Sequence, residues 1–421
     1  MSWIKNLFIV CIVSLITVLT LDTFSYIFFK NKVQTLFPFY GREISAFGRG
    51  YPRWYFMNDA EIGFDIAPNI KTTTWTKPVE YGLYNVWGNS FGCFDDEWGS
   101  NNLINGIYLA GDSFTWGYLR YEKKFGTILE NELQKKIYAC GVSHTGQQHQ
   151  FIKFKRLYDR GVRPSLVIVN IAENDVSNDF HFPHTEIIDG YMVENSKWCI
   201  EEGNENKTKL GFKVYKYSTE ELKERYENYQ QDFKNAKDLK SQSLRSTLKK
   251  YSLTLNVLNG FRHIVFSEIE AWKIGFLASD YLMDDGNVAA VGKCKDWIYG
   301  LYQFMTPSNY YTSEISKPNR EVIADWITHS QKNNYSLIFS LIPKKKSVKE
   351  ISGKGIYFEG LEIFIKRLGG EVWRFNDYLN ELSISEALKL YYLKDPHLNE
   401  DGNRAYADFL RQNIKIKQIF E

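Results

Sequence analysis

The sequence predicts an α/β fold of three layers, in which helices cover both faces of a central parallel sheet. Two observations lead to this prediction. Short apolar runs that suit buried strands alternate with longer stretches whose apolar residues recur at helical spacing. The clearest of the runs, residues 165–172, has the composition of a strand buried on both faces, which is typical of parallel sheets.

The strands and helices expected from this pattern alternate along the chain. Strands are expected at residues 107–110, 137–140, 165–172, 335–343 and 370–375. Helices are expected at residues 122–136, 148–159, 320–332 and 357–367, followed by a terminal amphipathic helix that contains Ala405, Phe409 and Leu410. Parallel strands need long crossover connections, which are usually helices, so the alternation itself favours a parallel sheet.

Two other regions flank or interrupt this α/β core, which we assign to residues 102–180 and 319–421. Residues 33–101 lack helical periodicity and contain strand-like runs rich in Thr, Tyr and Trp, which predicts a β-rich lead-in. Residues 181–318 are polar and break the alternation, so we expect a mainly helical insertion there. Its charged run at residues 220–250 is most simply a solvated helix face.

Residues 7–29 form an apolar segment that is long enough to cross a bilayer. We assign residues 1–32 to an uncleaved transmembrane signal-anchor, because no A-x-A cleavage site follows and because Asp22 fits cleavage poorly. A cleaved signal peptide is the alternative. Lysines occur on both sides of the apolar segment, so the charge rule barely chooses between the two membrane orientations.

The composition of the 421 residues is that of an ordinary globular protein, with 44% hydrophobic and 24% charged residues. A net charge of +2, with no basic patch beyond residues 344–346, argues against a nucleic-acid-binding protein. The aromatic share of 16% suits sugar stacking as well as a large core. Trp54, Tyr55 and Trp75 are candidates to line a glycan groove, and packing in the core is the alternative.

The five cysteines contain no CxxC pair and no spacing typical of a metal site. No cluster of metal ligands is visible in the sequence, and the serine chemistry argued below needs no cofactor, so we expect no metal and no organic cofactor. Cys11 lies in the apolar N-terminal segment, whereas Cys199 and Cys294 could pair in an oxidising compartment.

Polar side chains follow two of the predicted strands, at the point where each strand ends. Gly111, Asp112 and Ser113 come directly after the first strand, and Asn174 and Asp175 come after the strand at residues 165–172. Ligands of open parallel sheets collect beyond the carboxyl ends of the strands. Ser113 also stands between a strand and a helix, and such a strand-to-helix turn is a usual position for a nucleophile.

The remaining groups needed to cleave an ester are found near the last predicted helix and after the third predicted strand. His397 is the candidate base for Ser113, and Asp395 is placed to fix the tautomer and orientation of its imidazole. The side-chain amide of Asn174 can donate to the developing oxyanion, together with backbone N–H groups of Ser113 and of the turn at residues 141–146. The order of these residues and their strand-end placement predict a serine-dependent acyl hydrolase.

These motifs make the chain resemble the SGNH/GDSL hydrolases. Residues 111–117 (GDSFTWG) are similar to the first block of that family, residues 163–175 to the third, and residues 395–402 (DPHLNEDG) to the last. The resemblance implies a flavodoxin-like fold and a catalytic triad of Ser113, His397 and Asp395. It also implies an oxyanion hole that includes Asn174, with Asp112 and Asp175 as nearby supporting residues.

Three departures from the family pattern affect what the resemblance implies. The second block usually reads Asn-x-Gly-x-x-Gly, whereas residues 139–146 read ACGVSHTG, so the oxyanion glycine aligns with His144, or with Gly146 if the turn is shifted. Residues 89–92 (NSFG) resemble the lead-in of membrane-anchored bacterial members, but Cys93-Phe94 replace a Phe-Arg pair. The short Asp-x-His form resembles the members that act on polysaccharide O-acyl groups.

We therefore expect a single-pass membrane protein whose extracytoplasmic (periplasmic) domain is a serine esterase. Its expected substrate is an acyl ester, such as an O-acetyl group on a cell-surface glycan or lipid. One alternative is an O-acyltransferase that uses the same triad to acylate a polysaccharide. A second alternative is a non-catalytic glycan-binding module. No nucleic-acid partner is expected, and the sequence assigns no oligomeric state.

Overall fold

The computed structural model describes the greater part of the chain from residue 51 onward. The described ranges are residues 51–74, 84–99, 103–200, 212–224, 226–228, 294–295, 307–313, 315–349, 356–392 and 395–416, with single positions at 13, 16, 17, 20, 21 and 23. The chain divides into two units, residues 1–45 with 223–293 and residues 46–222 with 294–421. The described residues of the first unit are helical. The second unit contains the sheets and is described below.

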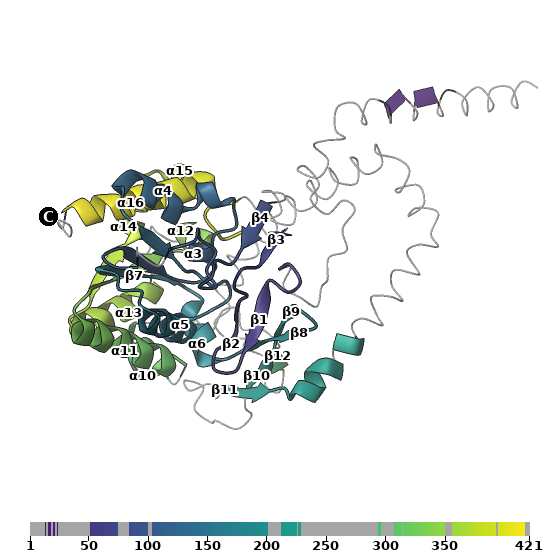
Figure 1. Ribbon diagram of the computed structural model, residues 1–421, viewed down its shortest axis with the longest axis horizontal. Helices are drawn as coiled ribbons and strands as arrows, with labels where there is room; N and C mark the ends of the chain where they lie inside the picture. Colours follow the sequence, from purple (N-terminus) through teal and green to yellow (C-terminus); the bar gives the residue numbers. More distant parts are fainter. Residues whose placement is uncertain are drawn as a thin grey trace, which may run out of the picture. The chain divides into compact units, whose positions relative to one another are not determined.

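A five-stranded parallel sheet forms the centre of the second unit (Figure 1). Its strands are β5 (Ile107–Ala110), β6 (Ile137–Ala139), β7 (Leu166–Ala172), β13 (Ser336–Ile342) and β14 (Glu371–Arg374). Their order across the sheet is β14-β13-β7-β5-β6, and every neighbouring pair is parallel. Numbered along the chain and read from the other edge, this is the order 2-1-3-4-5 of flavodoxin-like sheets. The predicted fold class is confirmed.

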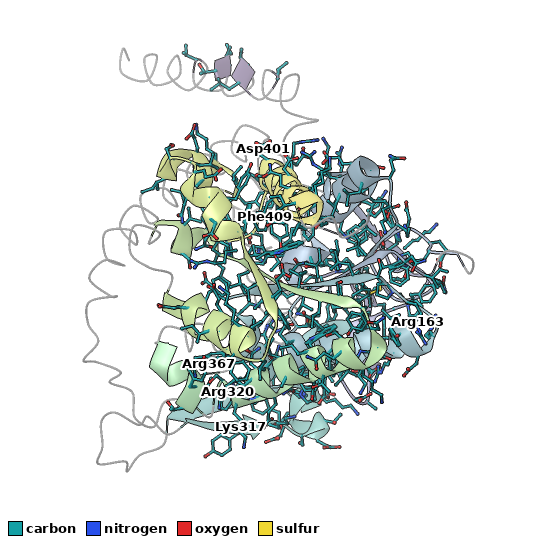
Figure 2. All side chains as sticks on the ribbon, turned by 90° about the vertical axis from the view of Figure 1, so that its left-hand side faces the viewer. Arg163, Lys317, Arg320, Arg367, Asp401 and Phe409 are labelled. Atoms are coloured by element: carbon teal, nitrogen blue, oxygen red, sulfur yellow. A yellow bond between two sulfur atoms is a disulfide. The ribbon has the colours of Figure 1, made fainter. Side chains whose placement is uncertain are left out.

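Helices cover both faces of this sheet (Figure 1). One face carries α5 (Gln147–Asp159), α6 (Asp175–Phe180), α11 (Lys317–Asn333) and α13 (Ile356–Arg367), with α10 (Pro307–Thr312) against α13. The other face carries α4 (Phe125–Leu133), α14 (Phe375–Asn380), α15 (Ile384–Lys389) and α16 (Glu400–Ile416). Figure 2 shows Phe409 of α16 and Arg320 of α11 on opposite sides of the sheet.

Burial explains why these elements form where they do. All seven residues of β7 are buried, as expected for a central strand covered on both faces. Against one face, aromatic residues of α4, α14 and α16 pack together, including Phe125, Phe375 and Tyr406. On the other, Phe154 of α5 stacks on Trp326 of α11 with ring centroids 5.0 Å apart.

Two antiparallel hairpins precede the central sheet. They are formed by β1 (Phe56–Asp59) with β2 (Gly63–Ile66), and by β3 (Lys71–Thr74) with β4 (Tyr84–Trp87). The predicted strand-like runs correspond to β3 and β4, whereas β1 and β2 had no specific prediction. Trp75 lies outside the described residues.

The segment predicted as a mainly helical insertion begins with strands. Residues 185–216 contain β8 (Thr185–Ile188), β9 (Tyr191–Glu194), β10 (Ser196–Ile200) and β11 (Phe212–Lys216), and β12 (Cys294–Lys295) pairs with β10. The expectation of helix is therefore wrong for the described residues of these strands, because their main chains pair with antiparallel neighbours. Residues 219–224 are helical, and most of the charged run at residues 220–250 lies outside the described residues.

Two cysteine pairs can be compared with the sequence expectations. The main chains of Cys199 and Cys294 lie opposite one another in the β10–β12 pair. A disulfide joins Cys93 to Cys140, two cysteines that the sequence did not single out as a pair. It fastens the segment after β4 to the end of β6.

A buried lysine, Lys124, packs against Phe94 of the Cys93-Phe94 pair. Its buried ammonium lies 4.2 Å from the centroid of the Phe94 ring and donates to the Phe94 carbonyl at 2.5 Å. Burial lowers the pKa of Lys124 to about 8, while the nearby Asp95 and Asp96 carboxylates oppose that shift. A buried cation from a different part of the chain thus packs on the Phe94 ring.

Within the described residues, no helix is both long enough and apolar enough to cross a membrane. The expected transmembrane segment at residues 7–29 lies outside the described residues except for the single helical positions between 13 and 23.

Candidate active site

The turn after β5, which we call the nucleophile turn (residues 111–116), presents Ser113 at the carboxyl edge of the sheet. Asp112 caps the short helix α3 (Ser113–Trp116), because its carboxylate accepts a hydrogen bond from the Phe114 N–H at 2.9 Å. Gly111 is required by a close approach, since a Cβ at this position would meet Thr115 Oγ1 at 2.0 Å. The turn therefore has one tight local conformation in which Ser113 follows the strand directly.

Ser113, His397 and Asp395 form a continuous chain of hydrogen bonds. The Ser113 Oγ lies 2.7 Å from Nε2 of His397, although 284 residues separate the two along the sequence. The Nδ1 atom of the same imidazole lies 2.5 Å from Oδ1 of Asp395. If Nδ1 carries the proton that it donates to Asp395, Nε2 has a lone pair that can accept the Ser113 proton.

Several contacts hold the imidazole of His397 in this orientation. Its ring lies between the aromatic rings of Phe114 and Tyr118, with centroids 4.6 Å and 4.5 Å away. Asp395 also accepts the main-chain N–H of His397 at 3.0 Å, so one carboxylate oxygen binds both the backbone and the ring. The His397 side chain is only 15% exposed.

Residues 391, 392 and 395–398, which we call the base loop, are held by residues from distant parts of the chain. The Tyr391 hydroxyl donates to the Pro343 carbonyl at 2.8 Å, and Lys345 Nζ donates to the Tyr392 carbonyl at 2.7 Å. The Tyr392 hydroxyl donates to the Tyr118 carbonyl at 2.9 Å. Lys345 begins the short helix α12 (Lys345–Lys349), which follows β13, so the loop is tied to the end of a sheet strand.

Asn174 and Ser113 meet at one oxygen of Asp112. Asn174 Nδ2 donates to Asp112 Oδ2 at 2.9 Å, and Ser113 Oγ lies 3.3 Å from the same oxygen. An amide nitrogen carries two hydrogens, so Asn174 can donate to Asp112 and to a further acceptor. The shared carboxylate therefore brings the predicted oxyanion donor beside the predicted nucleophile.

The turn at residues 141–146 contains both positions that align with the oxyanion glycine. His144 has a φ of +68°, in the left-handed region that favours glycine. Gly146 caps α5, and a Cβ there would meet Asp179 Oδ1 at 2.3 Å. Among the described residues, no hydrogen bond joins Gly146 to Ser113.

Asp175 binds the main chain near Asn174 and the Gln147 side chain rather than the Ser113 hydroxyl. Its Oδ2 accepts from the Ala172 N–H at 3.1 Å and from Gln147 Nε2 at 2.7 Å. Burial, and then the charges of Asp112 and Asp179, raise the pKa of Asp175 well above its usual range. Asp175 thus connects the end of β7 to the start of α5.

The sequence analysis did not identify the buried polar network that lies beneath the nucleophile turn. Asn170 Nδ2 donates to the Ala110 carbonyl and to Thr115 Oγ1, each at 3.0 Å. The Tyr406 hydroxyl donates to Asn170 Oδ1 at 2.7 Å and lies 2.6 Å from the Ser340 hydroxyl. An asparagine inside an otherwise apolar strand is the one feature that could have indicated this network, because buried amides need partners.

Lys344 is a further residue that the sequence analysis did not connect with the site. The Lys344 side chain is buried, and burial lowers its pKa, while four nearby carboxylates oppose that shift. These are Glu173, Asp112, Asp175 and Asp395. The Lys344 main-chain N–H donates to Glu173 Oε1 at 3.1 Å, and the Ser347 hydroxyl donates to the same oxygen. One member of the basic run at residues 344–346 is therefore a buried counter-charge for the acidic site.

Within the part of the chain that the structure describes, no group of three or more His, Cys, Asp or Glu residues could hold a metal ion. The arrangement of the site instead offers a hydroxyl, a base and hydrogen-bond donors, which are the groups that acyl transfer through a serine requires.

Comparisons with known proteins give limited information. No protein-family model matches the chain, and no curated protein matches it. Among solved structures, the chain is similar to LAE5, an alpha/beta hydrolase enzyme from the metagenome of Lake Arreo, Spain. The TM-score is 0.33 and the identity 8%, over 76% of this chain and 99% of that one. The assignment of the site therefore rests on its own geometry.

Proposed function

We propose that this protein is a serine esterase of the SGNH/GDSL type. The observation that carries the proposal is the chain of hydrogen bonds from Ser113 through His397 to Asp395. Each group lies within direct proton-transfer reach of the next, as a nucleophile, its base and an orienting acid must.

The proposed reaction has two stages. Ser113 Oγ attacks the ester carbonyl while His397 Nε2 takes its proton, and the resulting tetrahedral intermediate carries an oxyanion. The intermediate then collapses, the C–O bond to the alcohol breaks, and His397 returns the proton to that leaving oxygen. A water molecule next attacks the acyl-Ser113 ester with the same proton transfers, which releases the carboxylic acid and restores the serine.

The oxyanion needs donors on the side of the carbonyl away from His397. We assign this role to the Ser113 N–H, the Asn174 amide and an N–H of the turn at residues 141–146, with His144 or Gly146 as its source. Asp112 orients Asn174 through the bond of 2.9 Å. Lys344 offsets the negative charge of Asp112 and Asp395, which would otherwise oppose an oxyanion nearby.

The proposed substrate is an O-acyl group, such as acetate, on a cell-surface glycan or lipid, and the proposed location is the extracytoplasmic side of a membrane. The apolar segment at residues 7–29 supports the membrane anchor. The Cys93–Cys140 disulfide supports an oxidising compartment, since such bonds are rare in the cytosol.

An O-acyltransferase is the second candidate, and the burial of the site favours it. Ser113 is only 7% exposed, and aromatic rings flank His397. A sheltered acyl-serine reacts slowly with water and can await a sugar hydroxyl. The same triad would then move the acyl group onto that hydroxyl.

The test is turnover of p-nitrophenyl acetate by the detergent-solubilised full chain, with and without oligosaccharide acceptors. Ser113→Ala is compared with Ser165→Ala, a serine that hydrogen-bonds to the Asn105 carbonyl away from the triad. Hydrolysis that depends on Ser113 and is indifferent to acceptors supports the esterase, and acetyl transfer to sugar supports the transferase. If neither acetyl nor longer acyl esters show Ser113-dependent turnover, the proposal is wrong and the non-catalytic glycan-binding module takes its place.

A further inference from the structure

Trp54 differs from the aromatic residues next to it in the chain. Its side chain is 55% exposed, whereas Tyr55 and Phe56 are buried at 0% and 2%. Of the three residues that the sequence offered for a glycan groove, Tyr55 packs in the core and Trp54 lies at the surface. A large exposed indole so near a packed aromatic cluster calls for a physical reason.

The exposed indole packs against the turn between β8 and β9. The main-chain N–H of Trp54 donates to the Gly190 carbonyl at 2.8 Å. A Cβ at Gly190 would meet the Trp54 ring atoms Cδ2 and Cε2 at 2.6 and 2.7 Å, so only glycine lets the ring approach this closely. Trp54 itself has a φ of +65°, which is rare for a bulky residue. The strained backbone conformation of Trp54 thus accompanies a ring that stays at the surface.

Charged groups border the indole. The Arg53 guanidinium lies 5.5 Å from the centroid of the Trp54 ring and 5.4 Å from that of Tyr191. The same guanidinium forms an ion pair with Asp189 and donates from Nε to the Asp189 carbonyl at 2.7 Å. Both charged side chains remain almost half exposed. The exposed indole therefore has a hydrogen-bond donor over its ring and an acceptor paired with that donor.

The turn segment that carries Trp54 also reaches the candidate active site. The Tyr51 hydroxyl lies 2.7 Å from that of Tyr118, whose ring packs against His397. Two residues separate Tyr51 from Trp54, so the Cα atoms of these two residues are at most about 11 Å apart. The Tyr51 and Tyr118 side chains add to the separation between Trp54 and Ser113, so a glycan that reaches both must be an oligosaccharide of several sugar units.

We propose that Trp54, Arg53 and Asp189 form a subsite for a pyranose ring of the glycan that carries the reactive ester. The inference rests on the proposed function. One face of a pyranose exposes C–H groups that pack on an indole, and its ring hydroxyls can bind a carboxylate and a guanidinium. The ion pair at the edge of the ring disfavours a lipid occupant, because both charges would have to enter the headgroup region with the indole.

The first test compares two substrates, p-nitrophenyl acetate and acetylated xylo-oligosaccharide. Trp54→Ala is expected to lower the ratio of kcat/KM for the oligosaccharide to kcat/KM for the aryl ester by about three- to tenfold, the factor that one stacking contact provides. Trp54→Phe should recover part of the loss. Met57→Ala removes a neighbouring exposed apolar side chain and should leave both substrates unaffected. An unchanged ratio in Trp54→Ala overturns the proposal.

A second test separates failure of the subsite from failure of the proposed function. Binding of the same oligosaccharide is measured calorimetrically with Ser113→Ala and with the double variant Ser113→Ala/Trp54→Ala, neither of which can turn it over. The double variant should bind about three- to tenfold more weakly even if the protein proves inactive on esters. Equal affinity, or no binding by Ser113→Ala, contradicts the subsite. So does quenching by brominated lipid that is present in wild type and lost in Trp54→Phe, which would assign the indole to a membrane surface.

Discussion

The nucleophile turn and the base loop are held by different kinds of contact. The nucleophile turn is short, directly follows a sheet strand and rests on the buried amide of Asn170. The base loop has little regular structure and depends on bonds to other segments, such as those of Tyr391 to Pro343 and of Lys345 to Tyr392. The turn is therefore part of the sheet, whereas the loop is fastened to it.

This difference predicts that the two halves of the site respond differently to substitution. Contacts beneath the nucleophile turn are shared with the core, so their loss should destabilise the fold. Contacts of the base loop mainly set the position of His397, so their loss should affect turnover more than stability. The substitutions below test this contrast, beginning with the largest expected effect.

Asp395→Asn should lower kcat by about a thousand- to ten-thousandfold, because an amide in place of the carboxylate no longer holds the imidazole in the tautomer that accepts the Ser113 proton. The melting temperature should change little, since the substitution preserves the volume. Ester turnover and thermal unfolding measured on the same preparation check both parts. Activity within tenfold of wild type would show that Asp395 does not orient His397.

Asn174→Ala should lower kcat by about a hundred- to a thousandfold, the usual cost of one oxyanion donor. KM should change less, because the missing bond forms chiefly in the transition state. Steady-state kinetics over a range of ester concentrations give the two constants separately. A rise in KM with kcat preserved would instead make Asn174 a substrate-binding residue.

Tyr406→Phe should lower the free energy of unfolding by about 1–3 kcal/mol, because Asn170 Oδ1 and the Ser340 hydroxyl lose a partner inside the core. Denaturant titration measures the change. Tyr138→Phe is the matched control, since the buried Tyr138 hydroxyl makes a long bond of 3.5 Å to the Ile104 carbonyl and lies outside the Asn170 network. Equal stability of the two variants would remove the network as a support of the nucleophile turn.

Tyr391→Phe should cost about 0.5–1.5 kcal/mol of stability, the net value of a single neutral hydrogen bond. Its effect on kcat should be several-fold and larger than that of Tyr406→Phe, because the Tyr391 hydroxyl fastens the base loop to Pro343. The measurement is the ratio of the change in kcat to the change in the free energy of unfolding, determined for each of the two variants. The same ratio in both would erase the distinction between turn and loop.

The strands of residues 185–216 illustrate where reading the sequence reaches its limit. The polar composition and the charged run at residues 220–250 suggested a mainly helical insertion, yet the described residues 185–200 and 212–216 contain antiparallel strands. Asn58 makes two hydrogen bonds with the main chain of Ile187, at 2.9 and 2.7 Å, and so connects β1 to β8. The strands pair with one another, and the contacts of Ile187 with Asn58 add support from more than a hundred residues away, which local propensity does not contain.

The sequence alone determined the parallel sheet and the candidate residues Ser113, Asn174, Asp395 and His397, because burial periodicity and motif spacing are local properties of the chain. Only the tertiary structure decided the Cys93–Cys140 pairing, the buried position of Lys344 and the support of the nucleophile turn by Asn170 and Tyr406. Each of these depends on residues from distant segments meeting in a space with little water. In such a space an unpaired amide or charge is costly, so the fold must supply its partner.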